Sequence, residues 1–350
     1  MKKLACVMVM VLFIVISCPV YADSSIDLSH YDIDDNTVSV SATHSYTVQY
    51  KSLDLDLLCS TLLGTDCQYE RNDAYGIWYT STHDSDIDRL GLFDTDYATP
   101  NGSGFDGGFT YNAHHDDISF DDIIGVVANG KSVFEAIYQD DELLQSSLNK
   151  DLSFATLNEA ISSVDEIISS IGLDSFRCVV GYGLERDSVI DSIIQNDVVD
   201  SDRIAQYADV LTDCYVLFYQ QFIDELPVND TMLSDKMLSK DDPTETFAAA
   251  IVSQNGIETM YVINAYDVIA SENEGIEHDF QEALDIIQAR ISKGLNPSSL
   301  QIEKITKVLY PIGNVSTGIS LRPVWCISTV NSSQKYKNYI IDTHTLEIYE

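Results

Sequence analysis

A pair of histidines followed by a pair of aspartates is the most chemically suggestive cluster in this 350-residue chain. His114, His115, Asp116 and Asp117 have the composition of a metal or acid-base site. Neighbouring residues of an extended segment point in different directions, so both imidazoles cannot face one ion without a bend in the chain. We therefore expect residues 114–117 to form a solvated loop.

Several aspartates are candidates for the paired carboxylates of a hydrolase, which act as acid, base or nucleophile on either side of a glycosidic bond. These candidates are Asp54, Asp56, Asp84, Asp86 and Asp88. Because the chain contains 56 acidic residues, such pairs also arise by chance. An exported hydrolase using paired carboxylates is therefore an alternative to the main hypothesis below.

The segment 94–108 combines aspartates with glycines. Aspartates supply hard oxygen ligands, and glycines permit tight turns. Its spacing lacks the Gly at position 6 and the Glu at position 12 of an EF-hand loop. We expect an ordinary hairpin loop and no cofactor. A Ca²⁺-stabilised surface module remains the second alternative.

The familiar catalytic motifs are missing from the sequence. It contains no G-x-S-x-G, no H-E-x-x-H, no P-loop and no complete dinucleotide-binding fingerprint. Gly181 and Gly183 lack the third glycine of that fingerprint. The sequence thus predicts a non-catalytic protein, with no catalytic, cofactor-binding or metal-binding residue.

The amino terminus is typical of an export signal. Lys2 and Lys3 precede an apolar run over residues 4–16, and Val20, Tyr21 and Ala22 form a cleavage site. The run is shorter than the roughly 20 residues of a spanning helix. We expect residues 1–22 to be a signal peptide and the protein to be extracytoplasmic.

A lipoprotein signal overlaps this cleavage site. Cys18 follows the apolar run directly, with the small residue Ser17 before it. Cleavage before Cys18 would leave that cysteine lipidated, so the protein is either secreted or anchored to the membrane through Cys18.

The composition is strongly acidic but suits a folded protein. The formal net charge is −37, while 45% of the residues are hydrophobic. Nucleic acid is excluded as a partner because phosphate binding depends on clustered Lys and Arg. Anionic membrane surfaces are disfavoured for the same reason, which leaves the membrane only as a site for a lipid anchor.

The mature chain has an odd number of cysteines and no C-x-x-C pair, which makes a zinc site improbable. Cys178 and Cys214 both lie in apolar runs and could pair, but buried free thiols are the favoured state. The cysteines concerned are Cys59, Cys67, Cys178, Cys214 and Cys326.

The sequence contains two copies of one amphipathic helix pattern. Residues 156–161 and 279–284 share the order cap, apolar, amide, Glu, Ala, apolar, which predicts a capping box in each copy. Ile161 and Leu284 take equivalent positions on the apolar faces. Gly172 and Gly294 are expected to end the two helices in left-handed backbone.

Runs rich in β-branched and aromatic residues flank both helices and predict strands. These runs cover residues 176–183, 214–223, 257–269, 300–309, 319–330 and 336–349. Two short amphipathic segments within residues 189–211 predict an inserted helical connection. The expected fold is α+β, with tandem antiparallel sheets that are each covered by one amphipathic helix.

Five segments follow from these elements and from the polar stretch that carries Pro227 and Pro243. They are the signal peptide 1–22, an N-terminal α+β unit 23–150, a first helix-on-sheet unit 151–230, a linker 231–244 and a second helix-on-sheet unit 245–350.

The end of the chain resembles the closing strands of PepSY-like domains. Pro323, Val324 and Trp325 match a strand that pairs with one reading Tyr-x-Ile-Asp-x-x-Thr-Gly-Glu-Ile, here residues 339–348. Leu346 stands where that pattern usually has Gly.

Residues 154–172, 214–219 and 223–228, together with this final segment, resemble uncharacterised secreted or lipid-anchored proteins of Gram-positive, Clostridia-type bacteria. Their closing fold resembles that of extracytoplasmic accessory proteins that restrain cell-wall sensor kinases. The resemblance implies binding or regulation outside the membrane, with an unknown envelope protein or ligand as the partner.

Overall fold

The computed structural model describes residues 26–27, 32–64, 68–72, 76–83, 86–93, 108–115, 118–127, 142–196, 199–229, 246–292, 300–314, 317–331 and 336–349. The chain divides into two compact units. The larger unit comprises the described parts of Ser39–Gly275 and Lys307–Val324. The smaller unit comprises those of Met1–Val38, Ile276–Thr306 and Trp325–Glu350.

The main sheet of the larger unit has nine described strands, in the order β10, β9, β11, β12, β7, β6, β5, β4, with β8 also paired to β9. The strand pairings of this sheet are antiparallel throughout the described residues. The strands are β4 (Gln68–Asn72), β5 (Gly76–His83), β6 (Asp86–Phe93), β7 (Gly108–Asn112), β8 (Phe176–Leu184), β9 (Cys214–Ile223), β10 (Leu226–Pro227), β11 (Phe247–Ser253) and β12 (Gly256–Ile263).

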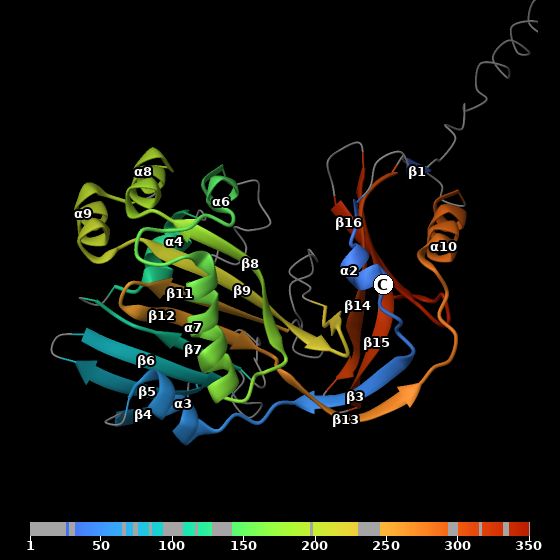
Figure 1. Cartoon of the computed structure of the whole chain (residues 1–350), viewed down its shortest axis with the longest axis horizontal. Coiled ribbons are helices and arrows are strands. Elements are labelled where there is room, and N and C mark those ends of the chain that lie inside the picture. Colours follow the sequence, from blue (N-terminus) through green and yellow to red (C-terminus); the bar gives the residue numbers. More distant parts are fainter. Residues whose placement is uncertain are drawn as a thin grey trace, which may run out of the picture. The chain divides into compact units, whose positions relative to one another are not determined.

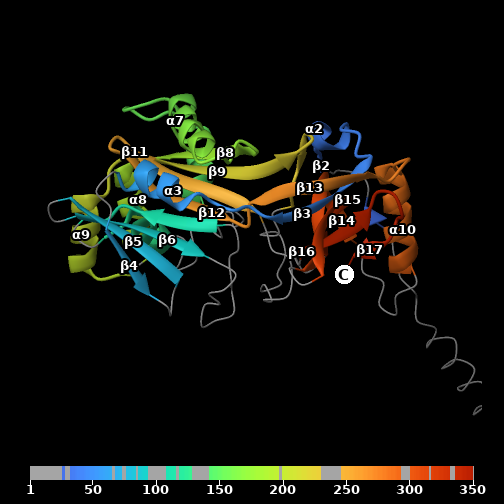
Figure 2. The same ribbon diagram turned by 90° about the horizontal axis from the view of Figure 1, so that it is seen from below.

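Helices cover both faces of this sheet. On one face α7 packs with α3, and Figure 2 shows α7 above β8 and β9. On the other face lie α4, α8 and α9, with the short α6 against α8. The helices are α3 (Leu55–Leu62), α4 (Phe120–Val127), α6 (Glu142–Ser147), α7 (Leu157–Ser170), α8 (Arg186–Asn196) and α9 (Ser201–Val210).

Strand β9 shows why both faces need cover. Tyr215, Leu217 and Tyr219 belong to the hydrophobic cluster under α7, while Val216 and Phe218 belong to the cluster under α8 and α9. Successive side chains of a strand point to opposite faces, so a continuous apolar run must be buried on both sides. One helix for this sheet, as the sequence led us to expect, is therefore too few.

The larger unit also contains part of a second sheet, in which β13 (Tyr266–Asn273) pairs antiparallel with β3 (His44–Tyr50). The other edge of β3 pairs with the start of β15, over Ile319–Leu321. Figure 1 draws β13 alongside β3. A separate core of Tyr46, Val48 and their neighbours lies under this region.

The smaller unit places α10 (Phe280–Ser292) against a sheet of mostly antiparallel strands. Strands β14 (Leu300–Asn314) and β15 (Gly318–Asn331) each contribute a part to either unit. The remaining elements are β1 (Ile26–Asp27), β2 (Asp32–Ile33), α2 (Asp35–Val38), β16 (Tyr336–Asp342) and β17 (Ile348–Tyr349). Two pairings, of β1 and of β2 with β14, are parallel.

Both predicted capping boxes are confirmed. The Thr156 hydroxyl accepts from the Glu159 amide at 3.3 Å, and the Glu159 carboxylate accepts from the Thr156 amide at 2.8 Å. Asp279 and Glu282 make the same exchange, at 3.0 and 3.2 Å. Gly172 ends α7 with φ +77°, as expected, whereas Gly294 lies outside the described residues.

The two apolar faces are less equivalent than the sequence indicated. Leu284 is fully buried in the core of the smaller unit, but Ile161 is only half-buried at the edge of its cluster. The buried positions of α7 are instead Ala160, Val164 and Ile168.

Most predicted strands are confirmed, but two of the runs each form two strands, and the second of these is 336–349, which forms β16 and β17. The run 257–269 forms two strands, β12 and β13, because the chain turns at Asn264, whose φ is +50°. Leu346 has φ +58°, the left-handed backbone that the glycine of the PepSY-like pattern would adopt.

The compact units do not follow the segment boundaries that we expected. Strand β9 of the expected first helix-on-sheet unit pairs with β11, which we had assigned to the second. Strand β12 pairs in turn with β7 from the amino-terminal third. Sheet pairing between segments far apart in the sequence leaves no local signal, and this is why the boundaries differ.

Candidate functional site

An open pocket of about 470 Å³ lies in the larger unit, where α8 begins and α9 ends. It is bounded by the segment before α7, the segment before β9 and the turn between β11 and β12. Its lining residues are Ser153, Phe154, Arg186, Ala208, Asp209, Leu211, Thr212, Asp213 and Gln254.

The first wall is fixed by Tyr215, which is fully buried. Its hydroxyl accepts from the Leu152 amide and donates to the Ala155 carbonyl, both at 2.6 Å. The ring of Phe154 packs against the Tyr215 ring, with centroids 5.6 Å apart. Buried tyrosine hydroxyls need such partners, and here the partners are the backbone on both sides of Ser153 and Phe154.

The second wall joins the start of α8 to the end of α9. The Arg186 guanidinium donates to the Ala208 carbonyl through Nε at 3.1 Å and through Nη2 at 2.5 Å. Its Nη1 donates to Asp187 at 2.7 Å. Asp213 accepts from the Arg186 amide at 2.9 Å, which satisfies a backbone donor of the first turn of α8.

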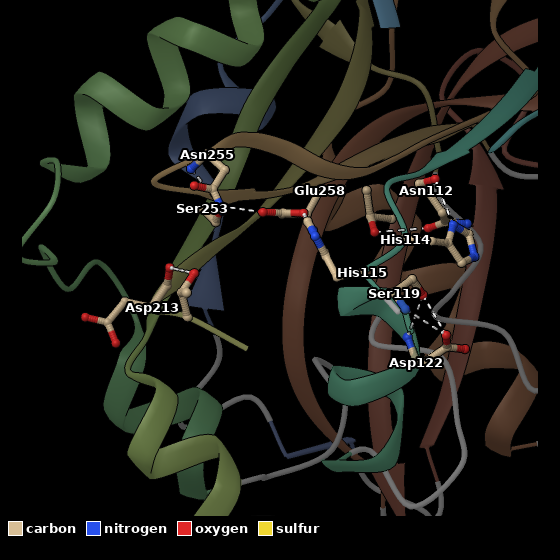
Figure 3. Close-up of polar contacts among 11 residues, drawn as sticks. Asn112, His114, His115, Ser119, Asp122, Asp213, Ser253, Asn255 and Glu258 are labelled. Carbon is tan, nitrogen blue, oxygen red and sulfur yellow. Dashed lines mark hydrogen bonds and ion pairs between the residues drawn. The ribbon is translucent and has the colours of Figure 1, made fainter. Parts of the chain in front are cut away.

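The third wall is the turn that carries Gln254. The Ser253 hydroxyl accepts from the Asn255 amide at 2.9 Å and donates to the Glu258 carboxylate. Glu258 is only 2% exposed, and its other oxygen lies 2.7 Å from Nε2 of His115. Figure 3 shows His115 reaching Glu258 from the segment after β7. This chain of contacts holds the turn in place.

This arrangement does not form a nucleophilic triad. In such a triad the histidine stands between the serine and the acid, so that it can take the hydroxyl proton. Here the carboxylate of Glu258 stands between Ser253 and His115. The network therefore positions the turn and does not activate Ser253.

Cys178 on β8 and Cys214 on β9 do not have the lowered pKa of an activated thiol. Burial raises the pKa of Cys214, and the charge of Glu258 adds to this. Burial likewise raises the pKa of Cys178, to about 12. Thiolates are the nucleophilic form, so a raised pKa disfavours the reactive form of both residues at neutral pH.

The segment that carries the histidine pair is a loop, as expected, but the expectation that it is solvated is wrong for His114. His114 is only 7% exposed, and its Nδ1 lies 3.1 Å from the Asn112 carbonyl. Burial lowers the pKa of His114, and the charge of Arg89 adds to this effect. Figure 3 shows His114 beside Asn112 and His115 directed at Glu258, so they do not converge on one ion. Asp116 and Asp117 lie outside the described residues.

The candidate aspartates are not brought together in the pocket. Asp54 caps α3 by accepting from the Leu57 amide at 3.1 Å, and Asp56 follows in the first turn. Asp86 and Asp88 lie on β6. Asp84 and most of the segment 94–108 fall outside the described residues, as do residues 1–22 with Cys18.

Cys178 and Cys214 are free thiols, so the alternative pairing of these two cysteines is not formed, and Cys59 and Cys326 are buried. Within the described ranges, His, Cys, Asp and Glu do not form a group of three or more that could hold a metal ion.

No helix in the described part of the chain is both long and apolar enough to span a bilayer.

Sequence reasoning missed the residues that build the pocket. Glu258 could have been noticed, because it is the one charged residue of the strand β12. Tyr215 and Arg186 gave no signal, since their partners are backbone groups of segments remote in the sequence.

No family model matches the chain, and no curated protein matches it. Solved structures do, among them the crystal structure of an uncharacterised protein from Eubacterium rectale. That protein is 11% identical, the match covers 91% of this chain and 89% of the other, and the TM-score is 0.50. At this identity the similarity shows the fold alone, an α+β arrangement with two antiparallel sheets.

Proposed function

We propose that this protein is an exported, non-catalytic binding protein of the cell envelope, and that the pocket beside Phe154 holds a small ligand that carries an amine. The observation that carries the proposal is the pocket itself. Its volume of about 470 Å³ suits a small ligand, and hydrogen bonds fix each of its three walls. Such preformed walls reduce the entropy cost of binding.

The charges in the pocket favour an amine over an acid. Asp209 and Asp213 both contribute to the lining, together with one cation, Arg186. The guanidinium of Arg186 is already bonded to Ala208 and Asp187, so its charge is largely engaged. Phe154 adds an aromatic face, to which an ammonium group is attracted.

Thermal unfolding with small ligands tests this proposal. We expect primary diamines to raise the melting temperature of the protein, while dicarboxylates of the same length leave it unchanged. Ser153→Trp should abolish the rise, because Ser153 is an exposed lining residue and the indole would fill the pocket.

Ser162→Trp is the matched control. Ser162 is an exposed serine on α7 that does not line the pocket, and its hydroxyl bonds only within its own helix. The control should keep the diamine response. An equal response in wild type and Ser153→Trp would contradict the proposal.

The rival hypothesis, an exported hydrolase, is favoured by one observation: two carboxylates, Asp209 and Asp213, line the same pocket. Against it, Asp213 already accepts the Arg186 amide and so serves the start of α8. Hydrolysis of cell-wall polysaccharide that is lost in Asp209→Asn would establish the rival.

Export and anchoring belong to the same proposal. We expect a mature chain that begins at Asp23 if Ala22 ends the signal, or at a lipidated Cys18 if the lipoprotein route is used. One intact-mass measurement on protein from the native envelope separates the two, and Cys18→Ser should release the anchored form. An anchored protein would act on membrane neighbours, as the resemblance to PepSY-like regulators of sensor kinases suggests.

A further inference from the structure

Strand β13 ends its sheet, as far as the described residues show. It pairs with β3 alone, over Tyr266–Asn273, but at Tyr266 the backbone amide donates to the Gln221 side chain at 3.0 Å and the carbonyl accepts from it at 2.7 Å, so the open part of the edge begins after Tyr266. The groups on the other edge of such a strand can pair with an added strand. Strand β8 has a comparable position in the main sheet, but there Asn149 donates to the Gly181 carbonyl at 3.0 Å and Leu148 bridges Tyr182. The edge of β8 is thus partly covered.

Apolar side chains of β13 are exposed. Val268 is 45% exposed and Ile269 is 58% exposed, and the residues from Ala270 to Asn273 are exposed as well. The register shifts between Val268 and Ala270, which makes Ile269 a bulge residue. Two adjacent β-branched apolar side chains on an open sheet edge are a typical surface for strand pairing.

Acidic residues outnumber basic ones near this edge by three to two. Asp267 pairs with Lys51 at 2.9 Å, and Glu274 accepts from the Ser45 hydroxyl at 2.6 Å and lies 3.9 Å from the Arg322 guanidinium. Glu272 is exposed between them. The whole chain carries a formal charge of −37, so a second copy would be repelled and a basic segment attracted.

We infer that the β13 edge binds an extended, basic segment of a partner protein by adding it as a further strand. Main-chain hydrogen bonds would supply the pairing, and Val268 and Ile269 would contact alternate apolar side chains of the partner. This surface is separate from the pocket, so either site can fail its test without affecting the other.

The test uses a labelled ten-residue peptide of alternating lysine and valine, with an alternating glutamate and valine peptide as the comparison. Fluorescence anisotropy should show saturable binding of the first peptide only. Ile269→Lys should weaken that binding by about tenfold or more, through charge repulsion at the edge. Hydrogen exchange on the wild-type protein should show new protection within β13 when the lysine peptide is added.

Val179→Lys is the matched control, because Val179 is 49% exposed and also lies at a register shift, in the edge strand β8. It changes the net charge by the same amount and should leave binding within about twofold. Equal weakening in both variants would show unspecific charge attraction and overturn the inference. Absence of protection in β13 would do the same, as would a wild-type dimer that Ile269→Lys dissociates.

Discussion

Helices α7 and α10 begin with the same cap, but they cover sheets that are assembled in different ways. The strands under α10 are mainly β14, β15 and β16, which follow it in the chain. The strands under α7 include β8 and β9, which also follow it, and then β11, β12 and β7, which come from remote segments. The comparison teaches that one local signal can serve two different sheet architectures.

The largest expected effects come from the cores beneath the two helices. Ile168→Ala under α7 and Leu284→Ala under α10 each remove a fully buried side chain, and each should cost about 2 to 5 kcal/mol. Because the two residues belong to separate hydrophobic clusters, calorimetry should show two transitions, each shifted by one substitution. One transition shifted by both would show that the units unfold together.

Removal of either cap side chain should lower the stability less than the core substitutions, and by a similar amount in the two helices. Thr156→Ala and Asp279→Ala each remove the acceptor of a first-turn amide, at a cost of about 1 kcal/mol. Chemical denaturation of each variant measures the change in the free energy of unfolding. A large difference between the two would mean that the copies of the cap are not equivalent.

A change of pH should affect the stability of the two units differently, because the buried residue His114 belongs to the larger unit. Its pKa is lowered by burial and by Arg89, while the Asn112 carbonyl, Asp122 and Asp88 oppose that change. A lowered pKa stabilises the fold above the unfolded pKa of about 6.5, and this contribution is lost as the pH falls through the folded value. Calorimetry should show that the transition temperature of the larger unit decreases as the pH is lowered from 7.5 to 5.

His114→Gln is the control for that measurement, since glutamine does not titrate. We expect the pH dependence of the larger unit's transition to become shallower in this variant. An unchanged slope would assign the effect to other groups.

The smallest effect is expected at the turn between β16 and β17. Leu346 has φ +58°, which is strained for a residue with a side chain, and it packs at the edge of the core of the smaller unit. Leu346→Ala loses the packing and keeps the strain, whereas Leu346→Gly loses both. The glycine variant should therefore be more stable than the alanine variant by about 1 kcal/mol, measured by denaturation. The reverse order would show that the turn is not strained.

The candidate site shows where sequence reasoning reached its limit. The sequence predicted a solvated loop at the histidine pair, yet His114 is buried. His115 bonds to Glu258, which is 143 residues away in the sequence. Tyr215 and the backbone at Leu152 are 63 residues apart. Contacts of this length depend on which strands pair, and no spacing rule along the chain predicts that.

The sequence by itself determined the local elements: the caps at Thr156 and Asp279, the end of α7 at Gly172, the two helices within 186–210 and the α+β class. These depend on hydrogen bonds and periodicity within a few residues, which a sequence states directly. Only the tertiary structure decided that β9 joins β8 to β11, that helices cover both faces of that sheet, and that the pocket and the β13 edge exist. Those features come from pairing between distant segments, where many partners have similar local propensity and the packing of the whole fold selects one.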